Sequence, residues 1–388
     1  MRFPEFHGEW EKCKLGDIAT LTKGSGISKD QRRATGTPCI LYGELYTTYK
    51  SEVIDYVVSK TDISDKNLVR SCANDIIIPS SGETAIDIST ARCVLSPDVL
   101  LGGDLNIIRL NDGDGRFFSY QLNGVRKHDI AKIAQGVSVV HLYGESIKGL
   151  TVSFPSNKEQ QKISTLLSLI DERIATQSKL IEKLESLIKG INQRVFLNSG
   201  INYKIREICE IKSGYSGSQL LSKKGLKVSR IETISGHKVN MERVGYVAPF
   251  ESSENYRLRV GDILFSNINS VEYIGNTAFI DKDYDLYHGM NLLRLTPNNM
   301  VVIPFYLYLL LNTNRMLNRF KTVCNKAVSQ ASINQTELGK TVVQIPPINT
   351  QEQICELYQA LYTKLETESH TKSLFQNQKQ YMLRQMFI

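Results

Sequence analysis

The chain has 388 residues, which is too long for one domain of typical size and suits two or three. Its content of 41% hydrophobic and 22% charged residues is ordinary for a folded globular protein and excludes an intrinsically disordered chain. A formal net charge of +7 is compatible with an anionic partner, although charge alone does not identify one. The seven cysteines form no close pair, and no apolar run reaches membrane-spanning length. We therefore expect a cytoplasmic protein with reduced thiols.

The first 155 residues predict a mixed α/β globule, because short strand-like runs alternate irregularly with a few helical patterns. A turn at 111–115 and a loop around 135–138 interrupt these runs. One helix is expected at Phe117–Arg126, and a buried helix of the same kind at Phe305–Leu311 later in the chain. The expected strands are Leu15–Leu21, Cys39–Tyr42, Val53–Val58, Asp75–Pro79, Ala91–Leu95, Leu105–Leu110 and Leu150–Phe154.

The stretch from Glu159 to Leu197 carries a heptad pattern, with apolar residues at alternating steps of four and three and Gln177 in the one polar position. This spacing predicts a long helix that buries a narrow stripe against another helix. At 1.5 Å per residue it would be about 58 Å long, far more than an ordinary globular helix. The stripe, or seam, is expected to consist of Ile163, Leu167, Ile170, Ile174, Ile181, Leu184, Ile188, Ile191 and Val195.

A second long helical pattern runs from Gln351 to Ile388, although Glu368 and Lys372 occupy seam positions in its middle. Both patterns follow a proline, at 155 and 346, and begin with Glu-Gln after good N-cap residues. Two long helices that each carry a seam predict one antiparallel coiled coil, and the alternative is a long core helix of one large domain. The apolar face of the second helix is expected to carry Ile354, Leu357, Leu361, Leu365, Phe375, Met382 and Met386.

Residues 200–347 repeat the order of elements found in residues 1–155. Four short motifs recur, at offsets of 190, 187, 185 and 191 residues. Nearly constant offsets predict a duplicated unit, with domains at 1–155 and 200–347 and helical spacer regions at 156–199 and 348–388. The matched motifs are Lys14–Ile18 with Lys204–Ile208, Asp75–Ile77 with Asp262–Leu264, Asn106–Leu110 with Asn291–Leu295, and Phe154–Pro155 with Ile345–Pro346.

The loops between matched strands differ in residue type, as in Ser80–Thr84 and Ser266–Ser270. A shared frame with divergent polar loops is what two readers of different targets would have. Duplex DNA suits such a protein, because half-sites about one helical turn, roughly 34 Å, apart lie on the same face. The alternatives are a scaffold that recruits proteins through its coiled coil, and a stand-alone enzyme with an unrecognised site. A steep fall of affinity with salt would favour DNA over protein partners.

The loop residues supply the chemistry that DNA binding needs, although a solvated loop residue is the alternative for each of them. Candidates for phosphate contacts are Lys23, Arg32, Arg33, Lys212, Lys223, Lys224 and Lys326. Candidates for base edges and for the adjoining surface are Ser25, Tyr42, Glu44, Tyr46, Ser80, Ser81, Gln135, Ser138, Ser213, Tyr215, Arg230, Glu232, Thr233, Ser266, Asn267, Asn269, Ser329, Gln330 and Asn334.

No catalytic or metal site is expected. The sequence has no Gly-x-x-x-x-Gly-Lys-Ser/Thr loop for ATP and no Gly-rich dinucleotide turn. Ile345 precedes Pro346–Pro347, where an amino-methyltransferase uses Asn or Asp. The six histidines form no pair at metal-ligand spacing, and His141 near Ser138 fits a structural histidine better than a nucleophile's base.

Several short motifs, in this order and with this duplication, resemble the specificity subunit of a type I restriction-modification enzyme, and the resemblance covers essentially the whole chain. These motifs are Arg2–Phe6 with Trp10, Lys14–Ile18, Glu159–Ile163, and Gly261–Leu264 with Ile274–Gly275.

The resemblance implies two target recognition domains that each bind half of a bipartite DNA sequence, with the paired helices setting the spacer length. It also implies two modification subunits that methylate adenine with S-adenosylmethionine, and optionally two restriction subunits that translocate and cleave DNA with ATP and Mg. The specificity subunit itself binds none of these cofactors and catalyses no reaction in that family.

Overall fold

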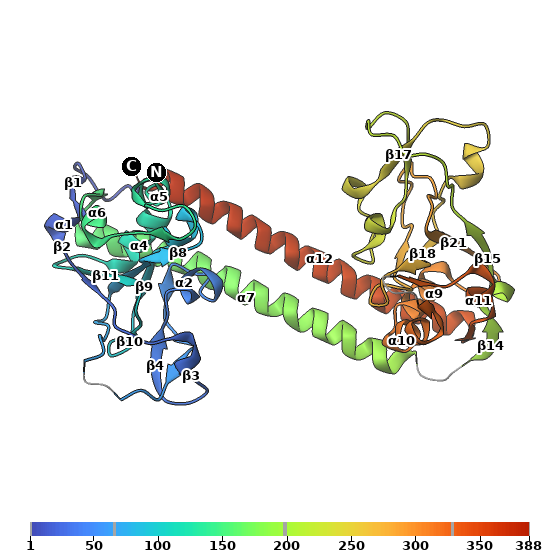
Figure 1. The fold of residues 1–388 in the computed structure, drawn as a ribbon, viewed down its shortest axis with the longest axis horizontal. Coiled ribbons are helices and arrows are strands. Elements are labelled where there is room, and N and C mark those ends of the chain that lie inside the picture. The colour runs from blue at the N-terminus through green and yellow to red at the C-terminus, as the bar shows by residue number, and fades with distance from the viewer. Residues whose placement is uncertain (1, 65–66, 197–199, 327–329, 388) are drawn as a thin grey trace. The chain divides into compact units, whose positions relative to one another are not determined.

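The computed structural model describes residues 2–64, 67–196, 200–326 and 330–387. The chain divides into two compact units, which we call unit 1 (residues 1–180 and 368–388) and unit 2 (residues 181–367). The chain begins and ends in unit 1 (Figure 1). Each unit combines a mixed α/β globule with one part of each of two long helices, so the predicted fold class is confirmed.

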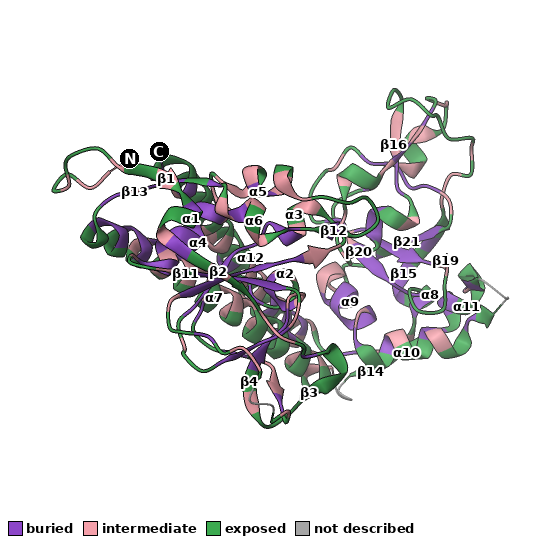
Figure 2. Ribbon diagram, turned by 60° about the vertical axis from the view of Figure 1, so that its left-hand side comes forward, coloured by how far each residue is buried: buried purple, intermediate pink, exposed green. Residues whose placement is uncertain are grey.

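The core of unit 1 is a five-stranded sheet of order β2-β11-β7-β9-β5, antiparallel except for the β5–β9 pair. Ile76 and Ile108 form a central register pair and are fully buried, as the purple strands of Figure 2 illustrate. Burial on both faces explains the continuous aliphatic runs in these strands. The strands are β2 (Ala19–Lys23), β5 (Val53–Ile54), β7 (Asp75–Pro79), β9 (Arg92–Val94) and β11 (Leu105–Leu110).

A smaller sheet of order β10-β4-β6-β3 and two separate two-stranded ladders complete the strands of unit 1. These strands are β1 (Glu11–Lys14), β3 (Arg32–Arg33), β4 (Thr37–Ile40), β6 (Lys60–Thr61), β8 (Ser81–Gly82), β10 (Leu100–Leu101), β12 (Val140–His141) and β13 (Thr151–Phe154). The short helices are α1 (Leu15–Ile18), α2 (Glu44–Thr47), α3 (Ala85–Ile88), α4 (Gly115–Asn123), α5 (Lys127–Ile133) and α6 (Gly144–Lys148), with a 3₁₀ turn η1 at Lys29–Gln31.

Unit 2 repeats this plan with a four-stranded antiparallel sheet of order β15-β21-β18-β20. The predicted buried helix at Phe305–Leu311 is confirmed as α9, most of which is purple in Figure 2. The strands are β14 (Ile201–Lys204), β15 (Cys209–Ser213), β16 (Leu226–Val228), β17 (Gly245–Val247), β18 (Ile263–Ser266), β19 (Ile268–Asn269), β20 (Thr277–Phe279), β21 (Leu292–Pro297), β22 (Asn325–Lys326), β23 (Ala331–Ser332) and β24 (Val342–Ile345). The helices are α8 (Ile205–Ile208), α9 (Pro304–Leu311), α10 (Asn314–Val323) and α11 (Gln335–Lys340), with 3₁₀ turns η2 (Ile231–Ile234), η3 (Met241–Arg243) and η4 (Ser253–Tyr256).

The expected strand at Leu15–Leu21 is wrong in its first half, which forms the helical turn α1. The backbone N–H of Lys14 donates to the Asp17 carboxylate at 3.1 Å, and a carboxylate at this position stabilises the start of a helical turn. The equivalent bond in unit 2 joins the N–H of Lys204 to Glu207 at 2.7 Å. The short motif therefore encodes the same capped turn in both units.

The structure corrects one matched pair of motifs by two residues. Ile108 pairs with Ile76 in unit 1, and Leu295 pairs with Ile263 in unit 2. Asn106–Leu110 therefore corresponds to Leu293–Pro297, at an offset of 187 residues, and not to Asn291–Leu295 at 185. A slip of two residues leaves every side chain on its own face of the sheet, so the alternation of residue types could not distinguish the two alignments.

The two long helices are α7 (Asn157–Val195), with 39 residues, and α12 (Ile348–Gln385), with 38. The fourth residue of each helix is a buried glutamine that is bonded at both ends of its amide. Gln160 donates to the carbonyl of Pro155 and accepts from the N–H of Asp114 at 3.0 Å. Gln351 donates to the carbonyl of Pro346 and accepts from the N–H of Ile303, both at 2.8 Å. These bonds fix the direction in which each helix leaves its globule.

The long helices pair in antiparallel fashion. In unit 1, Gln177 of α7 donates to Glu368 of α12, so the polar seam positions of the two helices contact each other. Ile163, Leu167, Ile170 and Ile188 are buried, and the other predicted seam residues of α7 are half-buried. In α12, Leu357 is 42% exposed and the fully buried Tyr358 takes its place. Leu197 and Ile388 lie outside the described residues.

All seven cysteines lie within the described ranges and are free thiols. Burial raises the pKa of Cys39 to about 11, so this thiol is protonated at neutral pH. Within the described residues, no helix combines the length and apolar character that crossing a membrane requires.

Replacing Gln351 by Leu should lower the free energy of unfolding by roughly 1–3 kcal/mol, because the N–H of Ile303 and the carbonyl of Pro346 would stay buried without this partner. The urea midpoint of the full chain measures this loss. Gln353→Leu, at an exposed position of the same helix turn, is the matched control and should shift the midpoint little. Equal midpoints for the two variants would contradict the anchoring role of Gln351.

Candidate nucleic-acid interface

Unit 1 contains a hollow of about 770 Å³ that is open to solvent and lies among three loops. The predicted residues Arg32, Tyr42 and Glu44 all line it. Arg32 is the first residue of β3, Tyr42 lies just before α2 and Glu44 begins α2, so the fold brings together residues about ten positions apart in the sequence. Lys29 and Thr47 also line this hollow, and the only sequence signal for them is their position in the same loops.

Glu44 has a structural contact for each of its carboxylate oxygens. It is 5% exposed, its Oε2 accepts from the N–H of Leu41 at 2.9 Å, and its Oε1 accepts from the Ser59 hydroxyl. Arg32 adds a contact to Oε1 at 3.4 Å and is 37% exposed. Glu44 therefore orients the guanidinium of Arg32, which faces the hollow.

A two-stranded ladder of β8 and β12 carries a second group of predicted residues. Ser81 pairs with His141, and the N–H and carbonyl of Gln135 bond the backbone of His141 at 2.9 and 2.7 Å. This closes the loop 135–141, where Gln135 and Ser138 are exposed. The Tyr46 ring lies nearby, since a Cβ atom added to Gly82 would come within 3.9 Å of the Tyr46 hydroxyl. Burial raises the pKa of Tyr46, so its hydroxyl is protonated and able to donate.

The remaining candidates of unit 1 differ in availability. Lys23 is exposed at the end of β2, and Arg33 pairs with Asp62 at 3.2 Å on the surface. The Ser25 hydroxyl accepts from the N–H of Val69 at 2.8 Å. Ser80 is buried, and its backbone bonds Asp104 and Leu142, so it supports the ladder.

Unit 2 carries a corresponding ladder of three strands in the order β19-β23-β22. It brings Asn269, Lys326 and Gln330 together, with Lys326 and Gln330 exposed. Ser266 is fully buried and accepts from the Asn269 amide at 3.1 Å. The buried Oδ1 of Asn267 has no hydrogen-bond partner among the described residues. Ser329 lies outside the described residues.

Two other candidates in unit 2 have structural contacts. The Thr233 hydroxyl is buried, donates to the carbonyl of Arg243 at 2.6 Å and accepts from the N–H of Arg230 at 2.9 Å. Asn334 is the N-cap of α11 and accepts from the N–H of Glu337 at 2.8 Å. Arg230 and Glu232 are exposed and pair with each other at 3.4 Å.

The loop after β15 ends in an aromatic cluster that the sequence did not predict. Tyr215 stacks on Phe250 with ring centroids 3.9 Å apart, and Tyr256 meets both rings edge-on. Lys212 and Ser213 precede this cluster and are exposed, and Lys212 pairs with Glu210 at 2.8 Å. Phe250 and Tyr256 are more than 30 residues from Tyr215, so only the fold brings the three rings together.

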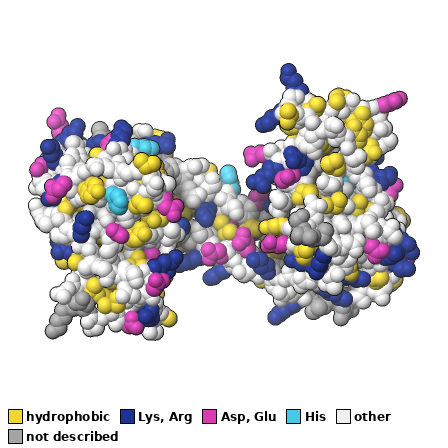
Figure 3. Space-filling view, viewed as in Figure 1, with side chains coloured by type: hydrophobic (Ala, Val, Ile, Leu, Met, Phe, Trp, Pro, Cys, Tyr) yellow, Lys and Arg dark blue, Asp and Glu magenta, His cyan; other side chains and the backbone are white. Residues whose placement is uncertain are grey.

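Charged side chains of both signs lie on the face of the molecule that Figure 3 draws. On the face drawn in Figure 3, Lys and Arg side chains are scattered over both units with Asp and Glu among them, and hydrophobic side chains gather over the part that carries β17. Within the described ranges, no group of three or more His, Cys, Asp or Glu side chains is arranged to hold a metal ion.

Comparison with known proteins identifies two repeats of one family. The sequence profile of the type I restriction modification DNA specificity domain matches residues 7–186 and again residues 201–374. A putative type I restriction enzyme MjaX specificity subunit from Methanocaldococcus jannaschii is 36% identical over 193 residues, which are 48% of this chain and 45% of that protein. The MjaVIII specificity subunit from the same organism is 22% identical over an alignment of 422 positions, covering 98% of this chain and 94% of that one.

Solved structures share the fold at low sequence identity. The S subunit of a type I restriction-modification system from M. genitalium superposes with a TM-score of 0.65 at 18% identity, covering 100% of this chain and 99% of that one. A chain from a structure on complex assembly and conformational transition of the type I R-M system gives 0.60 at 16% identity, covering 98% and 97%. With two profile matches that together span most of its length, the chain belongs to the type I restriction-modification specificity subunit family.

Proposed function

We propose that unit 1 and unit 2 each bind one half of a bipartite DNA target, and that the paired helices α7 and α12 fix the distance between the halves. The family's role is recognition of DNA sequence. The assignment of one half-site to each unit rests on the pair of corresponding ladders, β8–β12 and β19-β23-β22, whose loops carry different polar residues. In unit 1 these are Ser81, Gln135 and Ser138, and in unit 2 they are Asn269, Lys326 and Gln330.

The hollow of unit 1 supports the same proposal. Arginine donates two parallel hydrogen bonds to the O6 and N7 atoms of guanine in the major groove, and such recognition requires a guanidinium that is held in one orientation. The buried carboxylate of Glu44 contacts Nη1 of Arg32 at 3.4 Å, and the carbonyl of Lys29 accepts from its Nε at 3.3 Å, so two contacts hold the guanidinium at the edge of the hollow. Arg32 is therefore our choice for a base-reading residue of unit 1.

The paired helices also have a surface for partner subunits. Leu374 and Tyr381 of α12 are seven residues apart, so they share one face of the helix, and they are 53% and 55% exposed. A contiguous apolar patch on a protein surface can mark a binding site, and these two side chains are our candidates for part of one. We propose that modification subunits dock here and supply S-adenosylmethionine-dependent adenine methylation, while ATP- and Mg-dependent cleavage belongs to restriction subunits. The chain described here contributes recognition and no catalysis.

Methylome sequencing of a host that expresses this chain with a modification subunit should find methyladenine in both halves of a single bipartite motif. Exchange of residues 1–155 for those of another family member should change one half and leave the other half and the spacer unchanged. A motif that changes in both halves, or that persists without this chain, would contradict the assignment of one half to each unit.

Arg32→Ala should weaken binding of the cognate duplex by about 1–3 kcal/mol and relax the sequence preference at one position of one half-site. Lys12→Ala is the matched control, because Lys12 is an exposed cation on β1, outside the residues that line the hollow. Binding assays with cognate and altered duplexes at two salt concentrations separate base reading from phosphate contact. Loss of a phosphate contact lowers the affinity for all sequences alike and reduces its dependence on salt. An unchanged preference in Arg32→Ala would remove this residue from the interface.

Replacing Ile174 and Ile181 by Asp should abolish assembly with the modification subunit, because two carboxylates in the seam would separate the helices. Ala175→Asp with Ser186→Asp, at exposed positions of α7, is the matched control. Co-purification of the modification subunit measures assembly. If the seam variant assembled and kept its DNA specificity, the paired helices would not set the spacing.

A further inference from the structure

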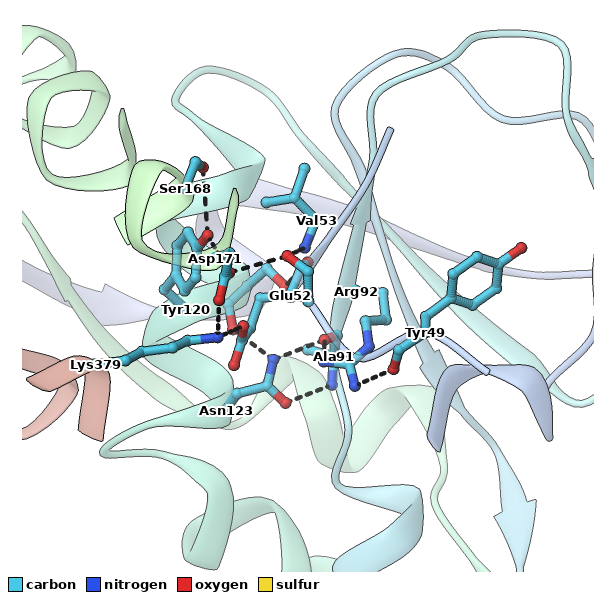
Figure 4. Close-up of polar contacts among 12 residues, drawn as sticks. Tyr49, Glu52, Val53, Ala91, Arg92, Tyr120, Asn123, Ser168, Asp171 and Lys379 are labelled. Carbon is cyan, nitrogen blue, oxygen red and sulfur yellow. Dashed lines mark hydrogen bonds and ion pairs between the residues drawn. The ribbon is translucent and has the colours of Figure 1, made fainter. Parts of the chain in front are cut away.

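The C-terminal end of α12 inserts a lysine into unit 1. The Lys379 side chain is only 9% exposed, and its Nζ contacts Oε2 of Glu52 and, at 2.5 Å, Oδ1 of Asp171 (Figure 4). Glu52 directly precedes β5 of the globule, and Asp171 lies on α7. We call Lys379, Glu52 and Asp171 the Lys379 cluster. One ammonium group thus joins the globule and both long helices.

The cluster is buried and its carboxylates are well bonded. The Glu52 and Asp171 side chains are each 10% exposed. Oδ2 of Asp171 accepts from the hydroxyls of Tyr120 at 2.8 Å and Ser51 at 2.9 Å. The neighbouring buried Arg92 donates to the carbonyls of Leu45 and Tyr49, and among the described residues Lys379 is the cation that pairs with both acids. Buried carboxylates that lose their cation are strongly destabilising.

The position in unit 2 that corresponds to Lys379 carries an uncharged residue. The matched pairs Gln160 with Gln351 and Pro155 with Pro346 set an offset of 191 residues at the long helices. At this offset Lys379 corresponds to Ile188, which is 8% exposed in the apolar core of unit 2. Asp171 corresponds to Tyr362, which packs against the same core. The site is therefore ionic in unit 1 and apolar in unit 2.

One helical turn away from these positions, the contact is apolar in unit 1 and polar in unit 2. Leu167 and Leu383 are both buried in the apolar core of unit 1. Their counterparts at an offset of 191 are Tyr358 and Asn192, and in unit 2 the Tyr358 hydroxyl donates to Oδ1 of Asn192. Unit 1 thus accepts a helix end with lysine and leucine, and unit 2 accepts one with isoleucine and asparagine, at the same two positions.

We propose that the Lys379 cluster and the Tyr358–Asn192 contact select which helix end each globule accepts. Because the chain is duplicated, α7 and α12 share one seam pattern, and the end of α7 from a second copy is a competitor for the site of α12 on unit 1. In that pairing Ile188 would face Glu52 and Asp171, and Asn192 would face Leu167. Each mismatch buries a polar group without a partner, which is an effective way to reject a wrong partner. The proposal concerns closure of the chain on itself and does not depend on DNA binding.

An exchange of helix ends in the full-length chain tests this selection. Lys379→Ile with Leu383→Asn gives the end of α12 the residues of α7, and Ile188→Lys with Asn192→Leu does the reverse. We expect each double variant to lose hydrogen-exchange protection in the altered helix end, while the other end keeps wild-type protection. A foreign end that kept wild-type protection would overturn the proposal.

Charge reversal separates selection from general damage to the fold. Lys379→Glu and Asp171→Lys should each lower the urea midpoint and the protection of residues 376–385 of α12. Combined in one chain they restore opposite charges at the same two positions, so we expect most of both losses to be recovered. The matched controls are Arg384→Glu and Glu172→Lys, the same charge changes at exposed positions, which should have little effect. A combined variant no better protected than the singles would overturn the proposal.

Discussion

Register between α7 and α12 is the constraint on which the other features depend. Gln177 and Glu368 are 191 residues apart, the same offset that relates the two helix starts, and they contact each other. Corresponding residues meet in an antiparallel pair only at its midpoint. The polar seam positions, which weaken the heptad pattern in each helix taken alone, therefore satisfy each other at this midpoint. A single polar residue in a seam is a known means of fixing register at some cost in stability.

Much of the architecture follows from the sequence, because it depends on periodicities that act over many residues. The seam of α7, the buried helix α9 and the duplication all have patterns longer than any local accident. Short motifs carried less information. The recurring motif places Asn106–Leu110 two residues away from its structural counterpart, and Leu15–Ile18 is a helical turn because Asp17 caps it. In α12, Tyr358 and not Leu357 lies in the seam. The polar tip of tyrosine makes such a position hard to assign from hydrophobicity.

The candidate interface was harder to predict than the fold. Residue type identifies the polar loop residues, but it does not separate a residue that faces solvent from one that stabilises its own loop. Glu44, Thr233 and Asn334 bond backbone groups of their own units, whereas Gln135, Ser138 and Gln330 are exposed. The Lys379 cluster had no sequence signal at all, because its three members come from positions 52, 171 and 379.

The ladder β8–β12 has a consequence for how such a chain changes over generations. Its loop from 135 to 139 is exposed, with Val137 at 96%, and adjoins a ladder with two residues per strand. Substitutions there remove almost no buried surface, so they cost little folding free energy. The sheet and the helix anchors can therefore stay constant while the loop explores new sequences. Under the proposed function, a lineage carrying this chain could acquire a new target without passing through an unstable intermediate.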